Sequence, residues 1–222
     1  MRVVTVDFDG TLYQGNSFKA MFDVAKKEYS LKQWLTVIGG TFKALARLVK
    51  EGKEAAKHTF FHAFVMSMKG KSKDELKTFF DALARSDLGK VNRPLVEKIK
   101  QHQANGDQIV ILSGALKPFL VAFTEVIDLT DADIIGTELK YDEYNIAAGL
   151  MGEIVNGERK AGAVLEWLHS RDLSIEAVTL WAYADSETDS PLLDMVDHPV
   201  VVNPNENMEK LAQEKGWPVF GN

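Results

Sequence analysis

The stretch VVTVDFDGTLYQ, residues 3–14, decides the fold of this chain. Its first four residues are β-branched, and such residues favour β-strands. Because the run carries no charge, it is typical of a strand that is buried on both faces inside a parallel sheet. Asp7 and Asp9 follow at once, with a single residue between them. Two like charges at the end of a buried strand repel each other, so another group must hold them together.

The composition is that of an ordinary globular protein and narrows the class of function. Of the 222 residues, 45% are hydrophobic and 26% are charged. The net charge of −6 argues against a nucleic-acid partner, and the absence of cysteine excludes disulfides and thiolate metal sites. Asp7 interrupts the apolar start, which argues against a signal peptide, and no apolar run reaches about 18 residues. We therefore expect a cytoplasmic monomer or homodimer with no membrane partner.

Residues 13–88 differ from the rest of the chain in net charge and in the spacing of their apolar residues. They hold 14 Lys and Arg against 8 Asp and Glu, a net of +6, whereas the remainder holds 12 against 24, a net of −12. Their apolar residues recur at helical spacing, and SKDEL at 72–76 is a capping box that starts a helix. The sequence predicts an all-helical insert over 13–88. Its charge either marks a separate task or reflects lysines exposed on helices.

After residue 88, strand-like and helix-like segments alternate along the chain. Expected helices cover 92–107, 117–127, 157–172, 190–197 and 206–216, and expected strands cover 108–115, part of 131–141, 177–185 and 199–203. A short hairpin is expected over 144–155. This alternation predicts an α/β fold with a Rossmann-like parallel sheet flanked by helices. The core would comprise residues 1–12 and 89–222, with 13–88 inserted as a helical cap.

Reactive side chains stand where the expected strands end, and open α/β sheets bind ligands at that edge. The first strand ends in Asp7, Asp9, Gly10 and Thr11, the second ends in Ser113 and Gly114, and the fourth ends in Asp185, with Asp189 four residues further on. Lys160 lies near the start of a helix that points to the same edge. Each group alone is commoner as a turn, a cap or a solvated charge. Their joint arrangement in this order indicates a site.

The residue types at this edge suit a metal and a phosphate. Crowded carboxylates raise one another's pKa values, and a divalent cation relieves that repulsion. Mg²⁺ prefers carboxylate and carbonyl oxygens, with water and phosphate oxygens completing its shell. The lysine, the serine hydroxyl and the backbone N–H groups near the glycines suit phosphate oxygens. The sequence therefore predicts a Mg²⁺ site beside a phosphate site.

These motifs resemble those of the haloacid dehalogenase superfamily over nearly the whole chain. DFDGTL at 7–12 is similar to the first motif, VILSG at 110–114 to the second, ERKAGAVLEWL around Lys160 to the third, and YADSETDSPLL at 183–193 to the fourth. Ala184 stands where many members have glycine. The placement of the helical insert resembles the C1-type cap of the phosphoserine phosphatase-like branch.

The resemblance implies a role for each matching residue. Asp7 would be the nucleophile that forms an aspartyl-phosphate, and Asp9 would be the general acid and then the general base. Asp7, the backbone carbonyl of Asp9 and Asp185 would bind Mg²⁺, while Asp189 would orient the site without binding the metal. The phosphate-binding set would be Thr11, Ser113, Gly114 and Lys160, with Thr11 also supporting its loop.

Two insert residues are candidate substrate contacts. Phosphoserine phosphatases typically carry a glutamate shortly after the first motif, and Asn16 stands at about that place, which argues against phosphoserine as the substrate. His58 lies four residues before His62 among phenylalanines, a spacing that suits a zinc ligand pair, a substrate contact or the margin of an apolar core. The core interpretation is favoured because no further zinc ligands accompany the pair.

The expected function is Mg²⁺-dependent hydrolysis of a small phosphorylated metabolite. Transfer of the phosphoryl group from Asp7 to an acceptor other than water is an alternative that the sequence leaves open. A non-catalytic phosphate-binding protein is disfavoured because Asp7, Asp9, Lys160 and Asp185 are all present.

Overall fold

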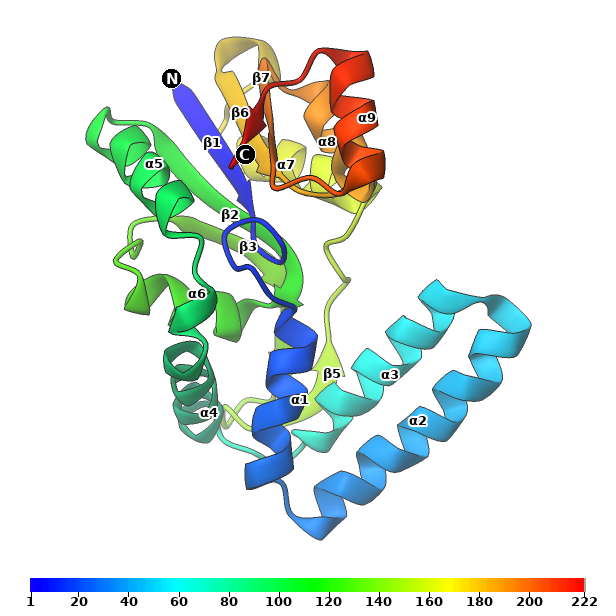
Figure 1. The fold of residues 1–222 in the computed structure, drawn as a ribbon. Helices are drawn as coiled ribbons and strands as arrows, with labels where there is room; N and C mark the ends of the chain where they lie inside the picture. Colours follow the sequence, from blue (N-terminus) through cyan, green and yellow to red (C-terminus); the bar gives the residue numbers. More distant parts are fainter. Residues whose placement is uncertain (222) are drawn as a thin grey trace.

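The core is a six-stranded sheet in which every neighbouring pair of strands is parallel. A computed structural model describes residues 1–221, apart from the side chain of Glu54. The strands of the sheet are β1 (Arg2–Asp7), β2 (Gln108–Leu116), β3 (Asp133–Thr137), β6 (Thr179–Ala184), β7 (His198–Val202) and β8 (Val219–Phe220), in the order β3-β2-β1-β6-β7-β8. The expected α/β fold is confirmed (Figure 1).

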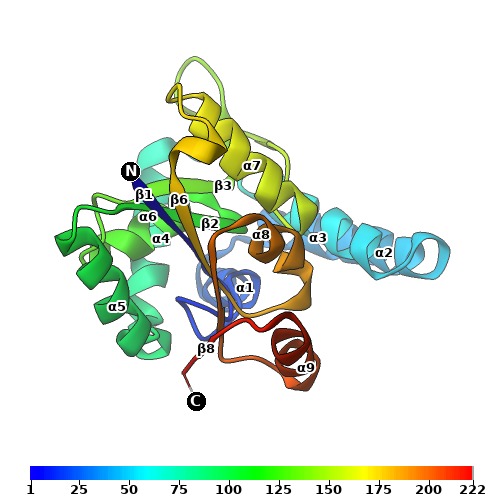
Figure 2. The same ribbon diagram turned by 90° about the horizontal axis from the view of Figure 1, so that it is seen from above.

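Helices cover both faces of this sheet, as Figure 2 shows from above. They are α5 (Arg93–Ala104), α6 (Lys117–Val126), α7 (Glu158–His169), α8 (Ser190–Met195) and α9 (Glu206–Lys215), with 3₁₀ turns η1 (Leu88–Lys90), η2 (Ile175–Ala177) and η3 (Glu187–Asp189). Val4 and Val6 of β1 pack on the face that carries α5 and α6. Val3 packs on the opposite face with α7, α8 and α9. β1 is thus buried on both sides, as its β-branched run predicts.

The insert is helical and projects from the core. Its helices are α1 (Ser17–Glu28), α2 (Leu31–Glu51), α3 (Lys53–Ser67) and α4 (Lys73–Ser86). Ser72 caps α4 in a capping box with Glu75, as the sequence predicts. α2 and α3 pack side by side as an arm (Figure 1). A Cβ added at Gly40 of α2 would lie 1.9 Å from the Cβ of Ala63, so this close packing requires glycine. None of the described helices has the length and apolar character needed to cross a membrane.

One expectation about the strands needs correction, and one strand was not expected. The hairpin consists of β4 (Leu139–Tyr141) and β5 (Ala147–Met151), so it starts before the expected range of 144–155. The reason is a turn in which Asp142 Oδ1 accepts hydrogen bonds from the backbone N–H groups of Tyr144 and Ile146. The C-terminal strand β8 was not expected, because two residues are too few to show a period.

The hairpin also joins the insert to the core. The backbone N–H of Ala147 donates to the carbonyl of Lys71 at 2.8 Å, and the N–H of Gly70 donates to the carbonyl of Ala147 at 2.9 Å. We keep the division into a core of 1–12 and 89–222 and a cap of 13–88 as a proposal. The hairpin is core sequence that packs on the cap.

Under the site, an aromatic cluster ties the loop after β1 to α6. Phe123 lies edge-on to Phe8 with 4.8 Å between ring centroids, and to Tyr13 with 5.4 Å. Phe119 contacts the same two rings. All four side chains are fully buried. The loop that carries the first motif therefore packs on Phe119 and Phe123 of α6, which form an apolar floor beneath it.

Replacement of Phe123 by alanine tests this floor. Phe123→Ala should lower the free energy of unfolding by about 3–5 kcal/mol, because it removes a fully buried ring and leaves a cavity. Val121→Ala on the same helix is the control, since Val121 is 38% exposed and should change stability by no more than about 0.5 kcal/mol. Urea unfolding measures both. Equal losses of stability in the two variants would show that Phe123 does not support the loop after β1.

Candidate active site

The candidate site lies where the chain reverses its course across the sheet. β1 is flanked by β2 on one side and by β6 on the other, and the strands that follow each of them continue outward. Such a switch point leaves a crevice at the carboxyl ends of the two central strands. β1 ends at Asp7, and β6 ends at Ala184, directly before Asp185. The topology therefore brings these two aspartates to one place.

The loop after β1 is folded tightly enough to place its groups against Asp185. The N–H of Gly10 donates to the carbonyl of Tyr13 at 2.8 Å, and the N–H of Tyr13 donates to the carbonyl of Phe8 at 2.9 Å. Gly10 has a φ of +86°, and a Cβ added there would lie 2.1 Å from Asp185 Oδ2. Only glycine meets both conditions without strain.

Lys160 is buried between two carboxylates. Its Nζ donates to Asp7 Oδ1 at 2.6 Å and forms an ion pair with Asp189 Oδ1 at 2.7 Å, although the side chain is only 6% exposed. Burial alone would lower the pKa of the ammonium, but the two carboxylates raise that pKa above its ordinary value. Lys160 is therefore positively charged at neutral pH.

Thr11 links the other side of the Asp7 carboxylate to Asp185. Its Oγ1 lies 3.1 Å from Asp7 Oδ2 and 3.2 Å from Asp185 Oδ1. The single hydroxyl proton is therefore within hydrogen-bonding distance of both carboxylates. The carbonyl of Thr11 accepts a hydrogen bond from Asn92 Nδ2 at 3.1 Å. Asn92 also caps α5 by accepting from the N–H of Leu95. The start of α5 thus fixes the position of Thr11.

The carboxylates at this edge outnumber the cation that pairs with them. Oxygen atoms of Asp7, Asp185 and Asp189 all lie within 4.8 Å of one another. Burial, followed by the charge of Asp7, raises the pKa of Asp185, and burial also raises the pKa of Asp189, with Lys160 opposing. A donor set made of carboxylate oxygens suits a hard divalent cation such as Mg²⁺. The residues present therefore fit the metal that the sequence predicts.

Asp9 is held by the first residue of the insert helix α1. Its Oδ1 accepts from the backbone N–H of Ser17 at 2.7 Å, and its Oδ2 accepts from the Ser17 hydroxyl at 2.6 Å. Burial is the largest cause that raises the pKa of the Asp9 carboxyl to about 6, against the two Ser17 donors, which lower it. A carboxyl with such a pKa can hold and release a proton near neutral pH.

Ser113 and Gly114 lie on the strand beside β1, at its carboxyl end. Leu112 is paired with Asp7 in the sheet, so Ser113 is the next residue beyond that pair. The Ser113 hydroxyl accepts from the N–H of Ala115 at 3.1 Å. A Cβ added at Gly114 would lie 1.9 Å from Asn156 Oδ1, which places Asn156 against the second motif.

The two insert candidates are not tied to the carboxylates. Asn16 is exposed and caps α1, because its Oδ1 accepts from the N–H of Lys19 at 2.9 Å. His58 is exposed on α3. Asn16 therefore acts as the N-cap of α1. Its place in the sequence, where a glutamate is expected, does not reveal this role. A substrate contact by either residue stays a prediction.

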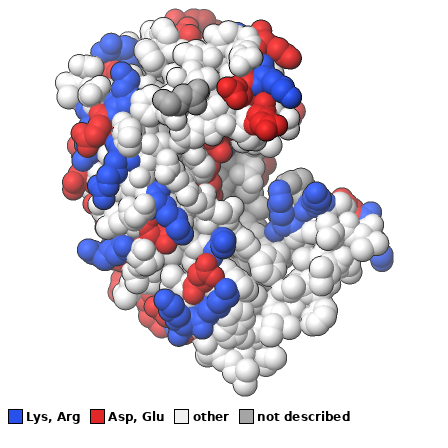
Figure 3. Space-filling model, viewed as in Figure 1, with Lys and Arg blue, Asp and Glu red and all other residues white. Residues whose placement is uncertain are grey.

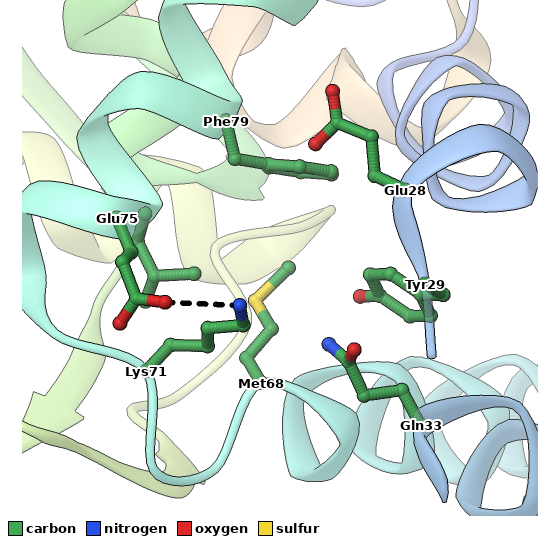
Figure 4. A pocket seen from close by; sticks show the side chains of 8 residues that line it. Glu28, Tyr29, Gln33, Met68, Lys71, Glu75 and Phe79 are labelled. Carbon is green, nitrogen blue, oxygen red and sulfur yellow. Dashed lines mark hydrogen bonds and ion pairs between the residues drawn. The ribbon is translucent and has the colours of Figure 1, made fainter. Parts of the chain in front are cut away.

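A separate small pocket lies within the insert and its connections (Figure 4). It has a volume of about 60 Å³ and is lined by side chains from the end of α1, the start of α2 and the α3–α4 segment. Lys71 and Glu75 form an ion pair of 3.0 Å on one side of it, and Phe79 and Tyr29 supply apolar walls. None of the carboxylates described above lines this pocket, so we assign it no part in the chemistry.

Three residues of the site were not expected from the sequence. Ser17 holds Asp9, Asn92 holds the loop of Thr11, and Asn156 lies against Gly114. The motif order NRP at 92–94 is an N-cap signal, which could have identified Asn92 as a cap but not as a partner of Thr11. Ser17 and Asn156 carry no local signal, because their partners come from other segments of the fold.

Comparisons with known proteins identify the family of this chain. The family model described as haloacid dehalogenase-like hydrolase matches residues 4–194. A histidinol-phosphatase of Neisseria meningitidis serogroup C is 30% identical over 152 residues, which are 67% of this chain and 68% of that protein. The phosphoserine phosphatase SerB1 of Mycobacterium tuberculosis is 28% identical over 223 residues, covering 96% of this chain and 68% of that protein.

A solved structure supports the fold. A protein of unknown function from Bordetella pertussis Tohama I superposes with a TM-score of 0.80 at 21% identity, covering 99% of this chain and 98% of that one. The family match spans both the strand that ends at Asp7 and the segment that carries Asp185 and Asp189. The chain belongs to the haloacid dehalogenase-like hydrolase family.

Proposed function

We propose that this chain is a Mg²⁺-dependent phosphatase that hydrolyses a small phosphate monoester through an aspartyl-phosphate on Asp7. The observation that carries the proposal is the Asp7 carboxylate itself. It lies at a strand end between Lys160 at 2.6 Å and Thr11 at 3.1 Å, with Asp185 on the far side of Thr11. Family relatives named as phosphatases of phosphoserine and histidinol phosphate support the reaction class.

The metal would be held by the oxygens that crowd this edge. Asp7 and Asp185 would supply carboxylate oxygens and Asp9 its backbone carbonyl. Bound Mg²⁺ would neutralise charge on phosphate oxygens. Asp189 would orient Lys160 through their 2.7 Å ion pair and stay outside the metal shell, as expected from the sequence.

In the first step, the carboxylate of Asp7 attacks phosphorus. A bond forms between an Asp7 oxygen and phosphorus while the bond between phosphorus and the ester oxygen breaks. The Asp9 carboxyl gives its proton to the departing oxygen, which leaves as an alcohol. Lys160, Ser113 and the N–H of Gly114 would hold the phosphoryl oxygens on which charge is stabilised.

In the second step, Asp9 acts as the base. Its carboxylate takes a proton from water, the water oxygen bonds to phosphorus, and the bond to Asp7 breaks. Inorganic phosphate leaves and both aspartates return to their starting states. The two hydrogen bonds from Ser17 hold the Asp9 carboxyl in one orientation for both proton transfers.

Asp7→Asn tests the covalent route. The amide is a poor nucleophile, so phosphate release should fall by about a thousandfold or more. The fold should persist, because Lys160 keeps its ion pair with Asp189. The assay follows phosphate release from phosphoserine, histidinol phosphate and other small esters, with and without Mg²⁺. Near-wild-type turnover in this variant would rule out the aspartyl-phosphate. Release only when an alcohol acceptor is added would favour the phosphotransferase alternative.

Ser17→Ala tests whether Ser17 positions the general acid. The change removes the 2.6 Å hydroxyl contact to Asp9 and leaves the backbone contact. We expect kcat for an alkyl phosphate to fall by about tenfold, because a poor leaving group needs the proton. For p-nitrophenyl phosphate, whose leaving group needs little protonation, the fall should be much smaller. Ser17→Thr, which keeps the hydroxyl, should restore the alkyl rate. Equal losses on both substrates would contradict a positioning role.

Mg²⁺ should stabilise the folded protein, and Asp185→Asn should weaken that effect. Without metal, Asp185→Asn should be at least as stable as the wild type, since it removes a charge repelled by Asp7. At a concentration 100 times its Kd, Mg²⁺ should stabilise the wild type by about 2.7 kcal/mol. Thermal unfolding with and without Mg²⁺ measures this. Asp131→Asn, an exposed position, is the control and should respond like the wild type; a full Mg²⁺ response in Asp185→Asn would argue against this metal site.

A further inference from the structure

The long helix α2 carries a continuous apolar stripe that faces away from the protein. The stripe consists of Leu31, Leu35, Ile38, Phe42, Leu45 and Val49. These positions alternate steps of four and three residues, so they lie on one face of the helix. Phe42 is 70% exposed and Val49 is 88% exposed. Scattered exposed apolar residues are normal, but a contiguous row along a whole helix indicates an interaction surface.

The opposite face of α2 is already used. Val37, Gly40 and Ala44 are buried there, and Gly40 packs directly on Ala63 of α3. α3 lies between α2 and the sheet, which leaves α2 as the outermost helix of the arm (Figure 1). The stripe is therefore not covered by any part of the chain that the structure describes.

Positive charges line one flank of the stripe. Lys32, Lys43 and Lys50 each follow a stripe residue directly in the sequence. One residue corresponds to a turn of about 100° around the helix, so the three lysines lie along the same side of the stripe. All three are exposed, and none forms an ion pair with another described residue. The face of the arm seen in Figure 3 is largely uncharged, with lysine and arginine gathered near its free end.

Among the described side chains of α2, no unpaired acid is left to offset this flank. The acid of α2 is Glu51, and it already pairs with Arg47 at 3.3 Å. Two copies joined through their stripes would bring lysine-lined helices together with no acidic partner on the stripe. An anionic surface, by contrast, would meet both the apolar row and the cationic flank. Lysine stems can lie along apolar surface while their ammonium groups reach toward phosphates.

We propose that α2 is an interfacial helix that docks this protein on an anionic lipid surface. Its apolar stripe would enter the boundary between headgroups and acyl chains, and Lys32, Lys43 and Lys50 would contact the anionic headgroups. The helix would lie in the plane of the membrane surface without crossing the bilayer. The inference replaces the expectation of no membrane partner. It does not depend on the proposed phosphatase activity, because none of these residues touches the carboxylate cluster.

Vesicle flotation tests the proposal. The wild type should float with vesicles of phosphatidylcholine that contain roughly one-third phosphatidylserine, and much less with phosphatidylcholine alone. Added salt should weaken the binding. The double variant Leu35→Gln/Phe42→Gln should lower the vesicle-bound to free ratio by at least about tenfold. Lys43→Glu/Lys50→Glu should lower it by about tenfold or more on the anionic vesicles only.

Two matched controls separate the stripe from general stickiness. Leu165→Gln on α7 replaces an apolar side chain that is 43% exposed, and Lys210→Glu on α9 reverses an exposed lysine. Neither should change flotation. Circular dichroism should show every variant folded, since all the substituted side chains are exposed.

Three results would overturn the proposal. The first is a wild type that stays unbound to anionic vesicles at low salt. The second is flotation that the Leu35/Phe42 variant does not reduce. The third is a dimer, measured by light scattering, that the same variant dissociates while no flotation occurs; this result would assign the stripe to a second copy of the chain.

Discussion

The buried contact between Lys160 and Asp7 is the interaction on which the site depends. A buried charge is costly unless it is paired, and Lys160 is paired twice, with Asp7 of β1 and with Asp189 of η3. Three separate segments are thereby fixed around one ammonium group. The surplus of negative charge that remains is held near Asp185, on the other side of Thr11. The ammonium thus allows Asp7 to stay charged at the end of a buried strand, while the second like charge, Asp9, is held separately by the two hydrogen bonds from Ser17.

The second constraint is the link between Asp9 and Ser17, because it joins the chemistry to the insert. Asp9 lies on the loop after β1, whereas Ser17 is the first residue of α1. The first turn of the insert therefore fixes the orientation of the Asp9 carboxylate. A motion that carried α1 away from the core would also release Asp9. At the other end of the insert, the β4–β5 hairpin hydrogen-bonds to the α3–α4 segment.

The parts of the fold that sequence predicts well are those in which one local pattern has one structural outcome. The β-branched run before Asp7 becomes β1, and Ser72 with Glu75 starts α4. The edge that gathers Asp7 and Asp185 follows from strand topology, and Lys160 is brought there by the start of α7. Contacts that depend on how segments meet have no such pattern. Ser17 against Asp9 and Asn156 against Gly114 are of this kind, and the hairpin began early because a side chain of its turn, Asp142, bonds two backbone groups.

The insert shows the same limit on a larger scale. A helix with apolar residues on two faces does not reveal which face its neighbour covers. In α2 the covering helix is α3, and Gly40 packs directly on Ala63, where the absence of a side chain lets the two helices approach closely. The buried face is thus made of small residues, and the larger apolar side chains, such as Phe42 and Leu45, are left outside. The basic charge of the insert and its exposed apolar stripe then have one physical explanation. Both suit an anionic lipid surface, in which negatively charged headgroups cover an apolar interior. The sequence alone reveals the charge imbalance, but it does not show which apolar residues of α2 are exposed.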